Sequence, residues 1–154
     1  MKKTFLVIIT LFMSFSAFSQ LSTEENPYTY KLEGFNYQNI TTLKVDAPDL
    51  QQVIEEDIEN DKQNKMMRFG VIVPVYKDFF ELADKKQTAD GTVWTLSVES
   101  QDAEALIFYS DNFKLPRSGK FFVYNPERTK ILGAFTQRNN NEFNTFATEY
   151  IEGE

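Results

Sequence analysis

The feature that most constrains the fold is a series of short apolar segments in the second half of the chain. Residues 92–99 alternate, with Trp94, Leu96 and Val98 on one face and Thr95, Ser97 and Glu99 on the other. This period of two is typical of a half-buried β-strand, and the apolar face is the best candidate for the core. Three further segments have the same character: residues 105–110, 120–124 and 129–135.

Turn-forming residues separate these segments. Asp111-Asn112 follows the first of them, and residues 115–119 contain a proline and a glycine. Asn125-Pro126-Glu127-Arg128 separates the last two, and its proline favours a type I turn. Short strands spaced by turns predict a mainly β fold, an antiparallel β-sandwich of jelly-roll-like form.

One short helix is expected on the N-terminal side of these strands. Asp46-Ala47-Pro48-Asp49 is a helix-start signal, because acidic side chains suit the positive end of the helix dipole. Leu50, Val53, Ile54 and Ile58 then follow at helical spacing, with acidic residues on the opposite face. The helix should end near residue 60, where the sequence becomes uniformly polar.

Three other segments carry weaker signals. Residues 69–76 are apolar and β-branched but contain Pro74, so a strand there would lie at a sheet edge or end at the proline. Residues 84–91 are interpreted as a polar loop. Residues 20–43 are interpreted as an extended lead-in, with a short strand at residues 29–32.

The first 19 residues have the three parts of a secretory signal peptide. Lys2 and Lys3 precede a short apolar run, and Ala17-Phe18-Ser19 provides a site of small residues for cleavage. Cleavage would leave Gln20 as the first residue of a 135-residue protein, the size of one domain. We therefore expect a secreted or extracytoplasmic protein with no membrane span after cleavage; a retained N-terminal anchor is the alternative.

The chain contains no histidine and no cysteine. Without cysteine there can be no disulfide, so packing must provide the stability, and 15 phenylalanines, seven tyrosines and one tryptophan supply the material. Without histidine the chain lacks the usual general base of a catalytic triad. We therefore predict that it is not an enzyme by itself, and we assign no catalytic, cofactor-binding or metal-binding residue.

The charge balance argues against two classes of partner. Loss of Lys2 and Lys3 lowers the number of basic residues from 16 to 14 against 23 acidic ones, so the net charge falls from −7 to −9. An acidic surface without a basic stripe disfavours nucleic acid and anionic membrane surfaces.

Acidic side chains offer three alternatives that a solvated surface explains more simply. Paired carboxylates in residues 55–61 could serve a glycosidase. Asp57, Glu59 and Asp61 have the spacing of a calcium loop but lack its glycine and closing glutamate. A calcium site at the rim of the sandwich could use three other acids, Asp111, Glu127 and Glu149.

Exposed aromatic rings could instead stack on sugars. The candidates are Tyr76, Phe79, Phe80 and Tyr109. The competing interpretation is that these rings belong to the core or to cross-strand pairs.

From about residue 45 onward, a longer pattern runs through the chain. Its densest part comprises Leu115-Pro116, Gly119, residues 121–129, residues 131–136 and Asn139-Asn140, and it continues in residues 146–149 and Gly153-Glu154. Upstream, Asp49-Leu50, Arg68-Phe69-Gly70, Trp94 and Asp111-Asn112-Phe113 occur in the same order. This pattern resembles the N-terminal non-catalytic region of secreted trypsin-like serine endopeptidases of the lysyl-endopeptidase type.

The resemblance implies a signal peptide (1–19), a lead-in (20–43) and a β-sandwich domain (44–154) that is truncated at its C-terminal end. In such proteins this region precedes a protease domain, which is the partner expected in cis, and a C-terminal tail sometimes directs type IX secretion. The implied function is that of a pro-region or accessory domain that assists folding, inhibits, or positions the protease domain. The rivals are a free-standing exported binding module, such as a carbohydrate-binding one, and an independent hydrolase that uses carboxylates.

Overall fold

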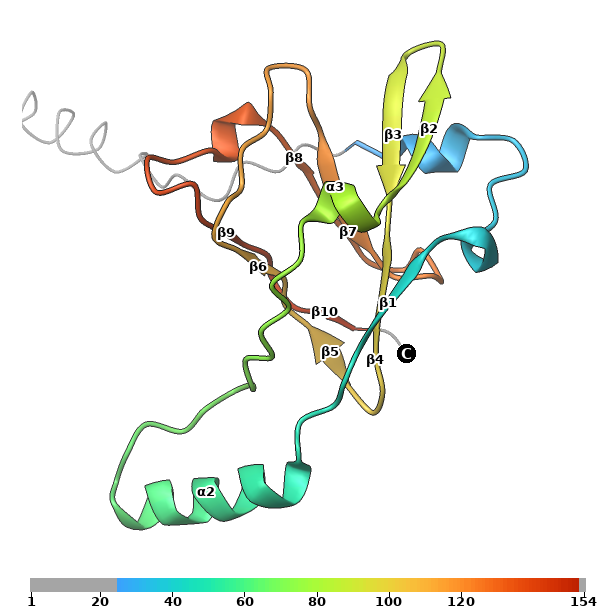
Figure 1. Cartoon of the computed structure of the whole chain (residues 1–154). Coiled ribbons are helices and arrows are strands. Elements are labelled where there is room, and N and C mark those ends of the chain that lie inside the picture. The colour runs from blue at the N-terminus through green and yellow to red at the C-terminus, as the bar shows by residue number, and fades with distance from the viewer. Residues whose placement is uncertain (1–24, 153–154) are drawn as a thin grey trace, which may run out of the picture.

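The computed structural model describes residues 25–152, and the predicted signal peptide lies outside them. The described chain is mainly β, as predicted, with short strands and few helical turns (Figure 1). Its strands form five two-stranded sheets, so the arrangement as a β-sandwich stays a prediction.

The hairpin of β7 (Phe121–Tyr124) and β8 (Ile131–Phe135) confirms two of the predicted strands. The turn between them forms at the predicted tetrapeptide, where the N–H of Arg128 donates to the carbonyl of Asn125 at 2.9 Å. Asn125 is buried, and its side chain donates to Thr129 and accepts from the N–H of Lys130. The turn is therefore fixed from within, and Arg128 adopts a φ of 59°.

A second hairpin corrects the interpretation of residues 84–91 as a loop. β2 (Asp84–Thr88) pairs antiparallel with β3 (Gly91–Thr95), with Thr88 opposite Gly91. Because four of the five residues of β2 are exposed, its sequence is polar throughout and shows no alternation of apolar and polar residues that would indicate a strand. The two-residue connection and the φ of 142° at Gly91 close the hairpin.

The predicted strand at residues 92–99 is split into two. Thr95 ends β3, and β4 (Ser97–Ser100) begins after Leu96 and pairs with β1 (Thr42–Val45). The two halves differ because each has its own partner strand. The β1–β4 pair is parallel, which differs from the wholly antiparallel arrangement predicted.

The predicted strand at residues 105–110 is likewise divided. β5 (Ala105–Leu106) pairs with β10 (Ile151–Glu152), and β6 (Tyr109–Ser110) pairs with β9 (Phe146–Ala147). Between the pairs, Phe108 and Thr148 exchange two hydrogen bonds. The end of the described chain therefore lies along residues 105–110. A short 3₁₀ turn, η4 (Gln137–Asn139), follows β8.

The centre of the core is a cluster of four phenylalanine rings. Phe146 stacks on Phe113 with ring centroids 4.2 Å apart and meets Phe135 edge-on at 4.8 Å. The Phe121 ring lies beside those of Phe135 and Phe146. Among the described residues, only Ala134, Phe135 and Ile151 are buried apolar residues, and no large side chain is completely enclosed. The core is therefore small.

The lead-in was predicted to be extended, with a short strand at residues 29–32, and this prediction is wrong. It forms two 3₁₀ turns, η2 (Tyr28–Lys31) and η3 (Tyr37–Asn39). Thr29 is buried, and its hydroxyl shares a 2.7 Å hydrogen bond with the hydroxyl of Tyr124 on β7. Tyr124 is distant from this segment in the sequence, so no local sequence pattern could reveal the contact.

The predicted helix is present as α2 (Leu50–Lys62), two residues longer than expected. It lies apart from the strands (Figure 1). Residues 69–76, for which an edge strand or a strand ending at Pro74 was expected, form no strand, because no strand within residues 25–152 pairs with them. The chain returns to the strands through a short helix, α3 (Phe79–Leu82).

Candidate functional site

The most unusual surface is the part of the chain that leaves the strands after β1 and returns at α3. We call α2 together with residues 63–78 the arm. We call the rest of the described chain, residues 25–49 and 79–152, the body. In Figure 1 the arm extends from this strand-rich body, with α2 at the far end of the arm. It carries more large exposed apolar side chains than any other region described.

Local interactions explain why α2 is helical without packing on the body. The carboxylate of Asp49 caps the first turn by accepting from the N–H groups of Gln51 and Gln52. Side-chain hydrogen bonds at i,i+4 spacing join Gln51 to Glu55 and Gln52 to Glu56. No residue of α2 is buried.

Most of the apolar stripe of α2 is therefore left uncovered by the other residues of 25–152. Leu50, Ile54 and Ile58 are each between 52% and 56% exposed. Helices at the surface of globular proteins normally bury such a stripe against their own core. This stripe is therefore available to another molecule.

Arg68 ties the rest of the arm back to α2. Its guanidinium donates from Nε to Asp57 at 2.5 Å and from an Nη atom to Glu56 at 2.8 Å. The hydrogen bond from Arg68, reinforced by one from Gln52, lowers the pKa of the Glu56 carboxyl below its ordinary value. One end of the extended part of the arm is thus fixed.

Residues 71–76 have the side-chain alternation of a strand. Ile72 and Tyr76 are each 93% exposed, whereas Val71, Val73 and Val75 are between 37% and 39% exposed. A period of two in exposure means that one face of this segment is fully open to solvent. Phe69, before the alternation begins, is 94% exposed.

The backbone of this segment is also unpaired. No N–H or C=O of residues 66–77 is hydrogen-bonded to another residue within 25–152. An extended segment with free main-chain groups and β-branched side chains can add to the edge of another sheet.

The second end of the extended segment is fixed at α3. Asp78 caps this short helix by accepting from the N–H of Phe80 at 2.7 Å. The Phe80 ring meets Trp94 of β3 edge-on at 5.1 Å, and the ammonium of Lys85 lies over the Trp94 ring at 5.1 Å from its centroid. Trp94, predicted to be buried, is therefore half-buried in a small aromatic group at the surface.

A tyrosine cluster joins the lead-in to the β7–β8 turn. The guanidinium of Arg128 lies 4.3 Å from the ring centroid of Tyr30, and its Nε donates to the hydroxyl of Tyr37 at 2.7 Å. Both rings also meet Tyr124 edge-on. Burial raises the pKa of Tyr124 to about 12, and burial likewise raises that of Tyr30.

These contacts give the cluster a structural role. The chemistry expected of a neutral tyrosine with a raised pKa is that of a hydrogen-bond donor, and Tyr124 is already bonded to Thr29. The cluster holds residues 28–37 on the body, so that the body includes the lead-in while the arm stays free.

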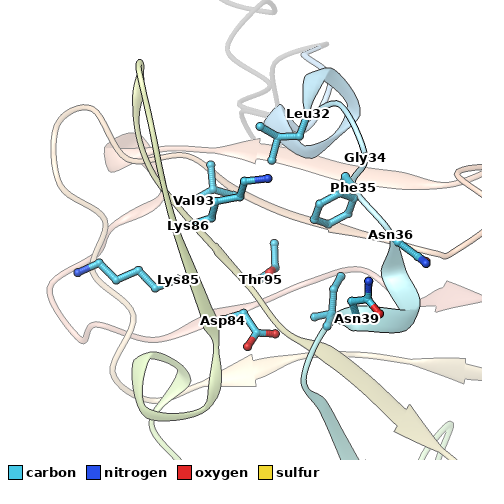
Figure 2. Close-up of a pocket in the computed structure, with 11 residues that line it drawn as sticks. Leu32, Gly34, Phe35, Asn36, Asn39, Asp84, Lys85, Lys86, Val93 and Thr95 are labelled. Atoms are coloured by element: carbon cyan, nitrogen blue, oxygen red, sulfur yellow. The ribbon is translucent and has the colours of Figure 1, made fainter.

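A cleft lies between the lead-in and the β2–β3 hairpin (Figure 2). Its volume is about 190 Å³, and Phe35, Val93 and Thr95 line it. Asp84 at its edge is engaged, because its carboxylate accepts from the N–H and hydroxyl of Thr41. Ligand pockets usually measure about 300–1,000 Å³, so this cleft gives no argument for a small-molecule site.

A second, open hollow lies beside β6 and β9. Its volume is about 390 Å³, and it is lined by aromatic and amide side chains, among them Tyr109, Asn139 and Asn141. Asn141 is bonded internally, since it donates to the carbonyl of Thr145 and accepts from the N–H groups of Phe143 and Thr145. Tyr109 is 70% exposed, so its ring is open to solvent.

The four aromatic candidates for sugar stacking therefore do not form one site. Phe79 and Phe80 contact each other edge-on beside Trp94. Tyr76 lies in the arm, and Tyr109 lies on β6 at the second hollow. All four are exposed, as that interpretation requires, but they lie on different parts of the surface.

Acidic side chains do not gather within the described residues. No group of three or more of them lies close enough together to hold a metal ion in residues 25–152. Asp57, one of the calcium-loop candidates, is bonded to Arg68 instead. Over the same residues, no helix combines the length and apolar character needed to cross a membrane.

No family model matches the chain, and no solved structure is significantly similar to it. The resemblance to the non-catalytic region of lysyl-endopeptidase-type proteases therefore stays a prediction from the sequence.

Proposed function

We propose that this chain is a non-catalytic pro-region or accessory domain of a secreted trypsin-like serine endopeptidase. It acts by binding the protease domain and thereby assists folding, inhibits or positions it. The observation that carries the proposal is the arm, which exposes an apolar helix stripe and an unpaired extended segment together.

The exposed apolar surface favours a protein partner. Soluble monomers rarely expose contiguous apolar patches beyond a few hundred Å², and larger ones mark interaction sites. Phe69, Ile72 and Tyr76 are almost completely exposed, and aromatic side chains are enriched at the centres of protein interfaces. The small core of the body points the same way, because docking of a partner would cover surface that the chain cannot bury alone.

The amino-acid inventory favours a binding role over a catalytic one. A triad requires a base with a pKa near neutrality, and this chain has no histidine. Two raised pKa values belong to tyrosines that hold the fold together, and both values are moved away from neutrality.

The experiment is a refolding and inhibition assay with the catalytic domain of a trypsin-like endopeptidase. The unfolded protease domain is diluted into buffer with and without an excess of this chain, and recovered hydrolysis of a lysyl amide substrate is measured. The proposal predicts that the chain changes the yield of active protease or the rate of hydrolysis at micromolar concentration. No effect on either quantity and no detectable binding would refute it.

Matched variants place the effect on the arm. Phe69→Ser removes an exposed ring of the arm, whereas Phe143→Ser removes a ring that is 73% exposed but lies elsewhere. Loss of a central aromatic contact typically weakens an interface by about 2 kcal/mol or more. We expect Phe69→Ser to weaken binding by that amount and Phe143→Ser to leave binding unchanged.

The second hollow supports one alternative function, a free-standing exported module that binds carbohydrate. An exposed tyrosine ring beside amide side chains is an arrangement that can stack on and hydrogen-bond to a sugar. The test is calorimetric titration of soluble oligosaccharides. Binding that disappears in Tyr109→Ala but persists in Tyr76→Ala would favour this module over the protease-associated role.

A further inference from the structure

The extended half of the arm has the form of a segment prepared for strand addition. It is unpaired along residues 66–77, it has one fully open face, and both of its ends are held. Arg68 fixes the first end to α2, and Asp78 with α3 fixes the second. A segment restrained at both ends loses less conformational entropy on binding than a free one.

The last residue of this segment is a lysine. Lys77 is exposed, forms no ion pair with any residue of 25–152, and follows directly after Val75 and Tyr76. An extended main chain that ends in an unpaired basic side chain has two recognition elements, one for a sheet edge and one for an acidic pocket.

Charge favours a partner that presents a carboxylate to Lys77, because this lysine has no ion-pair partner among residues 25–152. Arg68 is not available to the same partner, since Glu56 and Asp57 already hold its guanidinium.

We propose that residues 73–77 dock at the active site of a trypsin-like serine endopeptidase, with Lys77 in its acidic primary pocket. The segment adds as a strand beside that site, and the chain is thereby a competitive inhibitor. This inference rests on the proposed function for the partner and adds how the partner is held. Trypsin-like pockets bind basic side chains through a carboxylate at their base, which is the complement of Lys77.

Two structural features oppose turnover of the bound segment. The residue after Lys77 is Asp78, whose carboxylate caps α3, and α3 is in turn packed on Trp94 through Phe80. The chain on the far side of the Lys77–Asp78 bond is thus held in place. Lys65, the other lysine near the extended segment, lacks this setting because its N–H closes the end of α2 by donating to Asn60.

The test measures binding of the purified chain to a trypsin-like endopeptidase whose catalytic serine has been replaced by alanine, so that no cleavage occurs. Binding is measured for the unaltered chain, for Lys77→Gln and for the matched control Lys65→Gln. We expect Lys77→Gln to weaken binding by about 30-fold or more, because it removes one partner of a buried charge pair, and Lys65→Gln to change it less than about twofold. An arylamidine that fills the acidic pocket should displace the chain.

The outcomes separate this inference from the proposed function. Binding that survives both the arylamidine and Lys77→Gln, but is lost in Phe69→Ser, would overturn docking at the active site and leave a protease-binding arm standing. Absence of binding by every variant would overturn both. A dimer of the chain alone, dissociated by Phe69→Ser in sedimentation, would assign the arm to a second copy and overturn the inference.

Discussion

Truncation of Phe146 should be among the most damaging single substitutions in this protein. Its ring lies at the centre of the phenylalanine cluster, with Phe113 stacked at 4.2 Å and Phe135 edge-on at 4.8 Å. Phe146 also begins β9, which pairs with Tyr109 and Ser110 of β6. Its replacement by alanine therefore leaves a cavity where three aromatic contacts and a strand pair meet.

The magnitude follows from these contacts. Truncation of a core phenylalanine to alanine typically costs about 3–5 kcal/mol, and each favourable aromatic pair contributes about 0.5–1.5 kcal/mol. Phe146 retains some exposure, so we expect a loss near the lower end, about 3 kcal/mol. Proteins of this size have unfolding free energies of about 5–15 kcal/mol, so the variant would lose roughly a fifth to three fifths of its stability.

Equilibrium urea unfolding checks this value. A loss of about 3 kcal/mol corresponds to a fall in midpoint of about 1–3 M urea, given slopes of about 1–3 kcal/mol per molar. The control Phe143→Ala, at an exposed ring, should stay within about 0.5 kcal/mol. A loss below about 1 kcal/mol for Phe146→Ala would refute the assignment of this cluster as the core.

Three further predictions concern other parts of the molecule. Tyr124 should destabilise the fold between about pH 10 and 12, because its pKa is about 12 in the folded chain against 10.0 when unfolded, so unfolding releases its proton in that window; Tyr124→Phe should reduce the alkaline slope of stability in urea titrations, with Tyr30 contributing the rest, and an unchanged slope would contradict it. Arg68→Ala should return the pKa of Glu56 toward its ordinary value, as followed by NMR titration of the carboxyl, whereas a pKa that stays low would show that Arg68 does not hold the arm. The fluorescence of Trp94 should lie between buried and solvent-like maxima and shift to longer wavelength in Phe80→Ala; no shift would mean that α3 does not pack on β3.

The sequence predicted those elements whose signals are local. The prediction of α2 was correct because the cap at Asp49 and the helical side-chain pairs lie within the segment itself. The prediction of the β7–β8 hairpin was correct because the turn at Pro126 lies between two short apolar segments.

Errors arose where the partner decides the structure. Residues 84–88 are polar and were interpreted as a loop, but pairing with β3 makes them a strand. Residues 69–76 have strand-like side chains and were interpreted as an edge strand, but nothing in residues 25–152 pairs with them. The same error accounts for residues 29–32, where a contact with Tyr124 fixes a 3₁₀ turn.

The candidate site was predicted only in fragments. The apolar stripe of α2 was visible in the sequence, but its exposure was not, because an amphipathic helix normally packs its apolar side on the core of the same protein. Tyr76 was considered for its ring alone, without the unpaired backbone around it. Exposure and missing partners are properties of the whole fold, so these features became apparent only with the structure.

Hydrogen–deuterium exchange of the chain, alone and with a trypsin-like protease domain, tests the central claim most directly. In the free chain the amides of residues 66–77 lack hydrogen-bond partners among the described residues and should exchange at nearly the rate of an unfolded peptide. Addition of the protease domain should slow exchange in the arm and leave the β7–β8 hairpin unchanged. Binding without protection of residues 66–77, or strong protection of these amides in the free chain, would contradict the account.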